Sequence, residues 1–133
     1  MAETFHISVI TPERAVLEAE ATFAAFPAHD GEVGVLHGRA PFLFKLGAGL
    51  LRVDGPDGKE TLFIAGGFAQ MVNNRLTLLT EQAKDPAKID RAEAEKALAA
   101  ALAMKGTDEA AYRSREQAVA AARAQVRVAR MLG

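Results

Sequence analysis

The chain has 133 residues, half of them apolar and a quarter charged, with a formal net charge of −1 and no cysteine. This composition is typical of a small globular protein, and the lack of cysteine excludes disulfides, thiolate catalysis and zinc–thiolate sites. The nearly neutral net charge gives no global electrostatic basis for binding nucleic acid or an anionic membrane.

The N-terminal residues Met-Ala-Glu-Thr lack the basic start and long apolar core of a signal peptide. No apolar run approaches the ~18 residues that are needed to span a bilayer. From these features we expect a cytoplasmic protein.

The first eighty residues predict a series of short strands. Residues 5–10 alternate between apolar and polar side chains, which is typical of a half-buried strand with Phe5, Ile7 and Val9 on the inner face and His6 on the outer face. Further strands are expected at residues 14–20, 21–26, 32–36, 42–46, 50–53, 60–64, 68–72 and 75–80. In the last of these, Leu76 and Leu78 share a face.

Turn residues separate these strands every eight to twelve positions. Pro27 is expected to end the third strand, and the segment 54–58 is rich in Asp and Gly. Gly66-Gly67 predicts a bulge or a sharp corner, and Asn73-Asn74 predicts a tight hairpin because asparagine tolerates left-handed conformations. The pattern as a whole predicts an antiparallel β-sandwich or barrel.

The composition changes near residue 85, where Ala, Arg, Lys and Glu become dominant. Asp85-Pro86 is a good helix start, a first helix is expected over residues 89–105, and Gly106 fits its end. Thr107 fits the N-cap of a second helix that runs to about residue 131. The short connection predicts an antiparallel two-helix hairpin, so that residues 1–84 form a sandwich domain and residues 85–133 a helical domain.

Basic side chains cluster on one part of the second helix, within roughly a quarter to a third of its circumference: Arg113, Arg123, Arg127 and Arg130. This cluster is either a solvated edge or a docking face for an acidic partner. The opposite face carries alanines, whose burial contributes less than that of leucines. The hairpin is therefore expected to be lightly anchored and able to detach.

Constellations typical of catalysis are missing from the sequence. His6, His29 and His37 do not have a metal-binding spacing, and neither serine lies in a nucleophile-elbow motif. The glycines at 31, 34 and 38 favour turns over a phosphate loop, because no Lys-Ser/Thr and helix follow them. We predict no catalytic residue, no metal site and no enzyme acting alone.

Residues 31–41 read Gly-Glu-Val-Gly-Val-Leu-His-Gly-Arg-Ala-Pro. This run resembles the G-E-x-G-[IV]-x-P-G-H-A-P segment of the epsilon subunit of bacterial F-type ATP synthases. His37 stands where proline is usual, and Arg39 stands where histidine is usual. Residues 5–10, 64–67 and 124–128 also match, so the resemblance covers nearly all of the chain.

The resemblance implies a central-stalk subunit of the proton-translocating ATP synthase, with no catalytic role and no cofactor. Its sandwich would pack on the gamma subunit and the c-ring, through an interface that includes Glu32 (facing the c-ring), Arg39 (facing gamma), Thr11 and Phe44. The complex would place it peripherally on the cytoplasmic face of the bacterial inner membrane, with membrane association only through the complex.

The resemblance also implies a regulatory role for the helices. In that family the hairpin often extends into the catalytic head and blocks ATP hydrolysis, so the arginines of the second helix would meet the alpha and beta subunits. Some members bind ATP through a motif [IL]-D-x-x-R-A, matched here by Ile89, Asp90 and Ala94. Glu93 replaces the motif arginine and would repel phosphate, so we expect weak or absent ATP binding.

One alternative remains, a free-standing small β-barrel that binds nucleic acid or protein and carries a helical arm. A nucleic-acid-binding barrel needs a basic sheet face studded with aromatic residues. The expected strands carry few Lys or Arg, the chain has no tryptophan, and its one tyrosine, Tyr112, falls in a helix.

Overall fold

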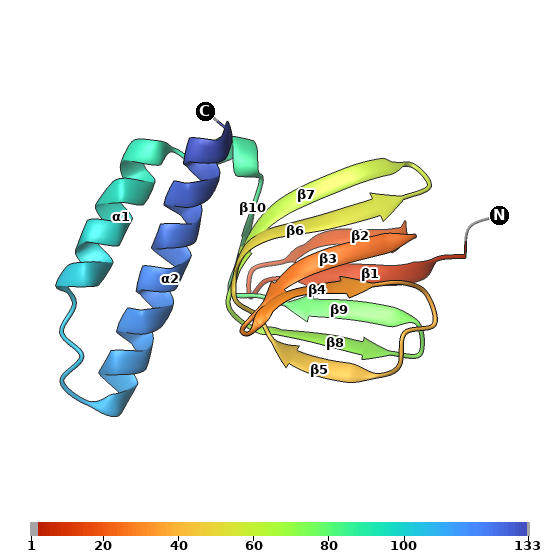
Figure 1. Ribbon diagram of the computed structural model, residues 1–133, viewed down its shortest axis with the longest axis horizontal. Helices are drawn as coiled ribbons and strands as arrows, with labels where there is room; N and C mark the ends of the chain where they lie inside the picture. Colours follow the sequence, from red (N-terminus) through yellow and green to blue (C-terminus); the bar gives the residue numbers. More distant parts are fainter. Residues whose placement is uncertain (1–2, 133) are drawn as a thin grey trace. The chain divides into compact units, whose positions relative to one another are not determined.

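The computed structural model describes residues 3–132 and divides into two compact units, Met1–Ala83 and Lys84–Gly133. The first unit holds nearly all of the strands and the second holds the helices (Figure 1). This division lies one residue before the boundary expected from the change in composition.

Ten strands form two five-stranded sheets (Figure 1). One sheet has the order β2-β1-β9-β8-β5, and the other has the order β10-β7-β6-β3-β4. The bounds are β1 Phe5–Ile10, β2 Ala15–Ala21, β3 Phe23–Ala28, β4 Gly31–Val35, β5 Phe42–Lys45, β6 Ala48–Gly55, β7 Gly58–Ala65, β8 Phe68–Val72, β9 Arg75–Leu79 and β10 Gln82–Lys84. The predicted sandwich is confirmed.

One pair of neighbouring strands departs from the antiparallel pattern. β1 and β9 run parallel, with Ile7 opposite Leu76, whereas β1–β2, β8–β9 and β5–β8 of the same sheet are antiparallel. β1 is therefore an interior strand that lies between β2, which follows it in sequence, and β9, which comes near the end of the sandwich domain.

The core lies between the sheets and follows the alternation of the sequence. Phe5, Ile7 and Val9 of β1 are buried on one face, and so are Leu76 and Leu78 of β9, as the alternation predicts. The two strands are neighbours in the sheet. Met71 of β8 belongs to the same sheet, and Phe26, Leu51, Val53 and Ile64 of the other sheet complete the core cluster. Each such side chain contributes roughly 1.5–3 kcal/mol through removal of apolar area from water.

Two predicted turns are confirmed by their backbone angles. Asn73 and Asn74, between β8 and β9, have φ values of 50° and 62°. Gly66 and Gly67, with φ values of 76° and 93°, form the corner at which the chain leaves β7 in one sheet and enters β8 in the other. Both angles at this corner are ones that residues other than glycine rarely adopt.

Most expected strands differ from the observed ones by one or two residues at one or both ends, and β10 was not expected. Pro27 lies inside β3, because β3 pairs with β6 only as far as Ala25, and the Pro27 carbonyl accepts a hydrogen bond from Gly47 N–H at 2.9 Å. No ladder donor is needed there, so proline is tolerated. The sequence pattern does not predict β10, since three residues are too few to show alternation.

The second unit begins with a short 3₁₀ turn, η1 (Pro86–Lys88), which Asp85 caps. The expected helix starts later, as α1 (Arg91–Ala103), because Asp90 is its N-cap and accepts from Glu93 N–H at 3.1 Å. α2 (Glu109–Leu132) begins after Asp108, whose carboxylate accepts from Ala111 N–H at 2.8 Å, so Asp108 takes the capping role expected of Thr107.

The two helices pack side by side as a hairpin (Figure 1). Tyr112 packs close to Gly106 in the connection, and Arg115 Nε donates to Met104 O at 3.1 Å, at the end of α1. Tyr112 and Arg115 begin a stripe of residues along α2 at alternating intervals of three and four. The stripe continues with small side chains: Val119, Ala122, Val126 and Ala129. The shared face of α2 is therefore built largely from small side chains.

Within residues 3–132, no helix is both long enough and apolar enough to cross a membrane.

Candidate docking surface

Apolar side chains are exposed on the outer face of the sheet that contains β5, β8 and β9. Phe68 and Val72 alternate along β8 with the buried Ala69 and Met71, so they point away from the core. Leu79 of β9 lies directly opposite Phe68. Exposed fractions in this outer apolar patch are 51% for Phe68, 39% for Val72, 53% for Leu79 and 66% for Leu43.

This patch has the character of an interaction surface. Single exposed apolar side chains are common on soluble proteins, but several on neighbouring strands of one face are typical of a docking site. Leu43 joins the patch from β5, since its register partner Gln70 lies between Phe68 and Val72 on the outer side of β8.

An aromatic cluster lies at the adjoining edge strand, β5. The rings of Phe42 and Phe44 stack with centroids 4.9 Å apart, and Phe26 lies 6.2 Å from Phe42. The Arg39 guanidinium sits 5.2 Å above the Phe42 ring, and its Nη1 donates to Gly34 O at 3.0 Å. Arg39 is thus held by a cation–π contact and a hydrogen bond, while it remains exposed.

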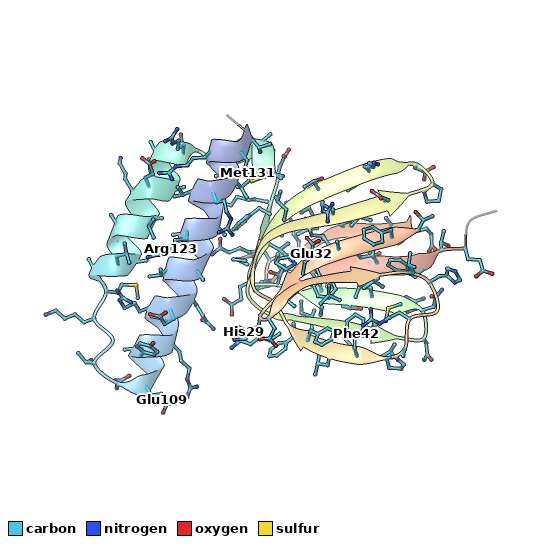
Figure 2. All side chains as sticks on the ribbon, viewed as in Figure 1. His29, Glu32, Phe42, Glu109, Arg123 and Met131 are labelled. Carbon is cyan, nitrogen blue, oxygen red and sulfur yellow. The ribbon has the colours of Figure 1, made fainter. Side chains whose placement is uncertain are left out.

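A shallow hollow of about 240 Å³ opens beside this cluster, between the β3–β4 turn, β4 and β5. Glu32 and Phe44 both line it. Figure 2 labels Glu32 and also His29, which lies in the β3–β4 turn. Glu32 accepts a hydrogen bond from Arg52 Nη2 at 3.0 Å, with both side chains more than half exposed. The structure therefore brings together Glu32 and Phe44, which the family resemblance assigns to one interface. Arg39 is linked to Phe44 through the ring of Phe42, which contacts both side chains.

Thr11, the fourth residue of that expected interface, occupies the β1–β2 turn and is 9% exposed. Its hydroxyl donates to Arg14 O at 3.2 Å and accepts from Arg14 N–H at 3.3 Å. Both contacts serve the turn, and a role for Thr11 in docking stays a prediction.

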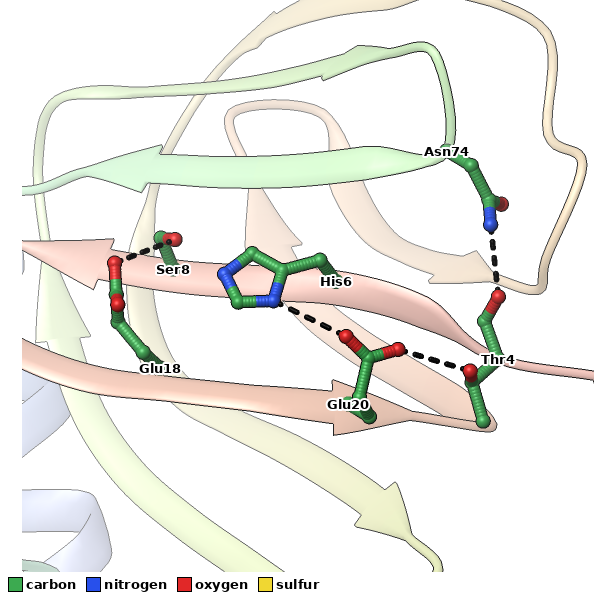
Figure 3. A network of polar contacts seen from close by, with 6 residues as sticks. All are labelled: Thr4, His6, Ser8, Glu18, Glu20 and Asn74. Atoms are coloured by element: carbon green, nitrogen blue, oxygen red, sulfur yellow. Dashed lines mark hydrogen bonds and ion pairs between the residues drawn. The ribbon is translucent and has the colours of Figure 1, made fainter.

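A polar network covers the outer face of β1 and β2 (Figure 3). Glu20 accepts a hydrogen bond from Thr4 Oγ1 at 2.9 Å and lies 3.3 Å from His6 Nδ1, while Ser8 donates to Glu18. Hydrogen bonds from Thr4 and His6 favour the ionised carboxylate and lower the pKa of Glu20. His6 lies on the outer face, as the alternation predicts, and it serves this network. No group of His, Cys, Asp or Glu within residues 3–132 is arranged to hold a metal ion.

The four arginines of the predicted basic cluster are exposed on α2 but differ in their partners (Figure 2 labels Arg123). Arg113 pairs with Glu109, one turn earlier, and Arg130 lies 3.7 Å from Glu95 on α1. Arg123 and Arg127 form no ion pair with any residue that the structure describes. These two guanidinium groups are open to an external acidic surface.

The residues of the degenerate ATP motif have roles within the hairpin. Asp90 caps α1, Ala94 is 1% exposed, and Ile89 is partly buried. Arg91 Nε lies 3.2 Å from Glu95 one turn along the helix, and Glu93 Oε1 lies 3.7 Å from Lys96 Nζ. The carboxylate that replaces the motif arginine is therefore exposed beside the helix N-terminus.

Two residues with important contacts were missed in the sequence. Arg115 Nε and Nη2 donate to the carbonyls of Met104 and Leu102, which lie at the end of α1 and would otherwise lack helical partners. Its place in the three-and-four spacing of α2 was the available signal. Asn74 bonds to two segments far away in sequence, which no local pattern reveals.

Taken together, these surfaces define a docking protein with two parts. The first is a β-sandwich with an exposed apolar face, and the second is a helical hairpin with exposed arginines on α2. The model of the ATP synthase delta/epsilon chain β-sandwich domain matches residues 4–86. The chain belongs to this ATP synthase delta/epsilon family.

Two relatives match over nearly their whole length. The ATP synthase epsilon chain of Rhodopirellula baltica is 43% identical, over 92% of this chain and 95% of its own, and that of Granulibacter bethesdensis is 38% identical, over 98% and 99%. Among solved structures, a chain of the Euglena gracilis mitochondrial ATP synthase (OSCP/F1/c-ring) superposes with a TM-score of 0.73 at 26% identity, over 90% of this chain and 78% of its own. A chain of the Tetrahymena thermophila central stalk/c-ring structure gives 0.68 at 14% identity, which supports the fold alone. A free-standing binding module is not supported.

Proposed function

We propose that this chain is a non-catalytic central-stalk subunit of a proton-translocating F-type ATP synthase. It acts at the cytoplasmic face of the bacterial inner membrane and reaches the membrane only through the complex. The observation that carries this proposal is the outer apolar patch on a chain of the delta/epsilon family. A subunit that must turn with a rotor needs a firm attachment, and a desolvated apolar surface supplies it.

The sandwich links the gamma subunit to the c-ring, with different parts of its surface for each. The hollow with Glu32 and Phe44 offers a carboxylate and an aromatic ring to the c-ring. Arg39, fixed over Phe42, offers a cation to gamma. A subunit fixed at both contacts couples proton-driven rotation of the ring to ATP synthesis at catalytic sites on other subunits, and it needs no cofactor of its own.

Replacing Phe68 by lysine tests the attachment. The assay uses the parent complex from which this subunit has been removed. We expect Phe68→Lys to bind it about fivefold more weakly than wild type, because a charge would be placed in an apolar contact. Binding is measured by surface-immobilised titration. Thr61→Lys, which adds the same charge at an exposed position of the other sheet, is the matched control and is expected to bind normally. Equal affinities for the two variants would contradict docking through this patch.

The helical hairpin is proposed to inhibit ATP hydrolysis by docking on the alpha and beta subunits. Arg123 and Arg127 support this role, since they are exposed and carry no partner among the described residues. Arg113 and Arg130 would add to the same surface once they separate from Glu109 and Glu95. Electrostatic complementarity of this kind sets the orientation and rate of docking.

We also propose that this hairpin does not bind ATP tightly. Asp90 is engaged as a helix cap, and Glu93 places a negative charge where a phosphate-binding arginine is expected. Calorimetry is expected to give a dissociation constant above about 1 mM, equivalent to less than about 4 kcal/mol of binding.

The variant Glu93→Arg restores the cation and is expected to bind ATP about fivefold more tightly, because a guanidinium pairs with phosphate through two hydrogen bonds. Lys96→Arg is the control, since it exchanges one cation for another three residues away. A wild-type dissociation constant well below 1 mM would contradict the proposal.

A further inference from the structure

The β4–β5 loop, residues 36–41, is exposed at every position and has no regular secondary structure. A loop of this kind is expected to sample many conformations unless contacts fix it, and ordering it upon binding would reduce affinity. Because the proposed gamma-facing Arg39 lies in this loop, the contacts that fix the loop determine how Arg39 is presented.

One side chain ties the loop to two other parts of the sandwich. Gly38 N–H donates to Asn74 Oδ1 at 2.8 Å, and Asn74 Nδ2 donates to Thr4 O, also at 2.8 Å. The contact to Thr4 is drawn in Figure 3. Segments at positions 4, 38 and 74 therefore meet at a single amide group.

Asparagine is suited to this place for two separate reasons. Its amide carries both a donor and an acceptor, which aspartate and glycine do not. It also tolerates the left-handed φ of 62° that the β8–β9 turn requires. The neighbouring Asn73 has a φ of 50° and makes no side-chain hydrogen bond with the residues that the structure describes.

Two further contacts hold the loop on either side of Gly38. Arg39 donates to Gly34 O and lies over the Phe42 ring, while His37 Nδ1 lies 2.8 Å from Glu3 Oε2. The His37–Glu3 pair is exposed, and such pairs contribute little. The Asn74 bridge joins neutral groups, so it does not depend on a protonation state, and it holds the loop at Gly38, near its middle.

We propose that Asn74 is a positioning residue for docking: it holds the β4–β5 loop in its bound form and so presents Arg39 to a carboxylate-bearing surface of the central stalk. This inference rests on the proposed function of the sandwich. Asn74 does not touch the partner and acts only through the loop. Because the loop is already ordered in the folded chain, its conformational entropy is lost on folding and does not reduce the binding affinity.

The test compares Asn74→Gly with Asn73→Gly in the full-length chain. Both glycines accept the left-handed turn, but only the first removes the bridge. Binding to the parent complex that lacks this subunit is measured at a temperature well below the melting temperatures of both variants. We expect Asn74→Gly to bind about fivefold more weakly than wild type, and Asn73→Gly to bind normally. Hydrogen exchange at the Gly38 amide is expected to become at least about tenfold faster in Asn74→Gly alone.

A double-mutant cycle with Arg39→Ala distinguishes positioning from general stabilisation. If Asn74 acts by presenting Arg39, the double variant binds like Arg39→Ala alone, because the loop then has no cation to place. Asn74→Asp, which keeps the acceptor for Gly38 and loses the donor to Thr4, is expected to give an intermediate affinity.

Three results would overturn the inference: wild-type affinity of Asn74→Gly, equal weakening by Asn73→Gly, or additive effects of Asn74→Gly and Arg39→Ala. If Arg39→Ala weakens binding in such a case, the proposed function stands without the role for Asn74. If Arg39→Ala and Phe68→Lys both bind normally, the proposed docking itself is wrong.

Discussion

Gly67→Ala is expected to lower the free energy of unfolding of the sandwich by at least about 3 kcal/mol. This is a large part of the total, because the free energy of unfolding of a small domain is only about 5–15 kcal/mol. Gly67 has a φ of 93°, and a Cβ atom placed on it would overlap the carbonyl oxygen of Leu79. That carbonyl belongs to the backbone of β9 and cannot rotate away like a side chain. The Gly67 carbonyl also accepts from Leu46 N–H at 2.8 Å, so a shift of the corner would break the contact that continues the pairing of β5 with β8.

The measurement is the free energy of unfolding by urea, followed by circular dichroism. Gly58→Ala is the matched control, since Gly58 also has a positive φ, 130°, but nothing lies within 4 Å of the position that its Cβ atom would take. It carries only the backbone cost of about 1–3 kcal/mol, without the overlap. If the two variants lost the same stability, the overlap with Leu79 would not be the reason for glycine at position 67.

Deleting residues 85–133 from the subunit in the parent complex is expected to raise ATP hydrolysis about tenfold, in line with coupling energies of about 1–3 kcal/mol between sites. The cut is placed after Lys84, since β10 (Gln82–Lys84) adds a strand to the sheet beside β7 and belongs with the sandwich. The sandwich keeps its docking surfaces, so ATP-driven proton pumping should be retained. Hydrolysis rates and pumping are measured on the same preparation.

Point substitutions locate the inhibitory surface within the deleted segment. Replacing Arg123 and Arg127 together by alanine is expected to reproduce part of the activation, since both are exposed and unpaired among the described residues. Arg113→Ala is the comparison variant and is expected to activate hydrolysis less, because Arg113 must first separate from Glu109 on its own helix. Unchanged hydrolysis after the deletion would leave the hairpin with an assembly role and remove inhibition from the proposed function.

Local patterns predict the elements well because they report which face of a segment is buried. Alternation indicates β1, and Asn73-Asn74 and Gly66-Gly67 indicate their turns, since each of these signals lies within a few residues. The pairing of β1 with β9 is different. The alternation within a strand shows which face is buried, but it does not show which other strand pairs with it. The parallel pairing of β1 with β9 could therefore not be predicted.

Helix boundaries differ from those expected where two capping residues compete. Asp85 and Asp90 both cap, the first a 3₁₀ turn and the second α1, and Asp108 rather than the adjacent Thr107 caps α2. For the candidate site, the grouping of Glu32 with Phe44 came from resemblance, and the geometry that joins them is non-local. The outer apolar patch and the Asn74 bridge depend on strand register and on contacts across the sandwich, which one sequence does not contain.

The parallel pairing of β1 has a consequence for synthesis of the chain on the ribosome. β1 and β2 can form their hairpin as soon as both have emerged, but the other edge of β1 has no partner until β9, near the end of the sandwich segment, has been made. An open strand edge is a template for association with other chains. A nascent chain paused before residue 75 therefore carries such an edge, and pairing of the completed β9 with β1 removes it.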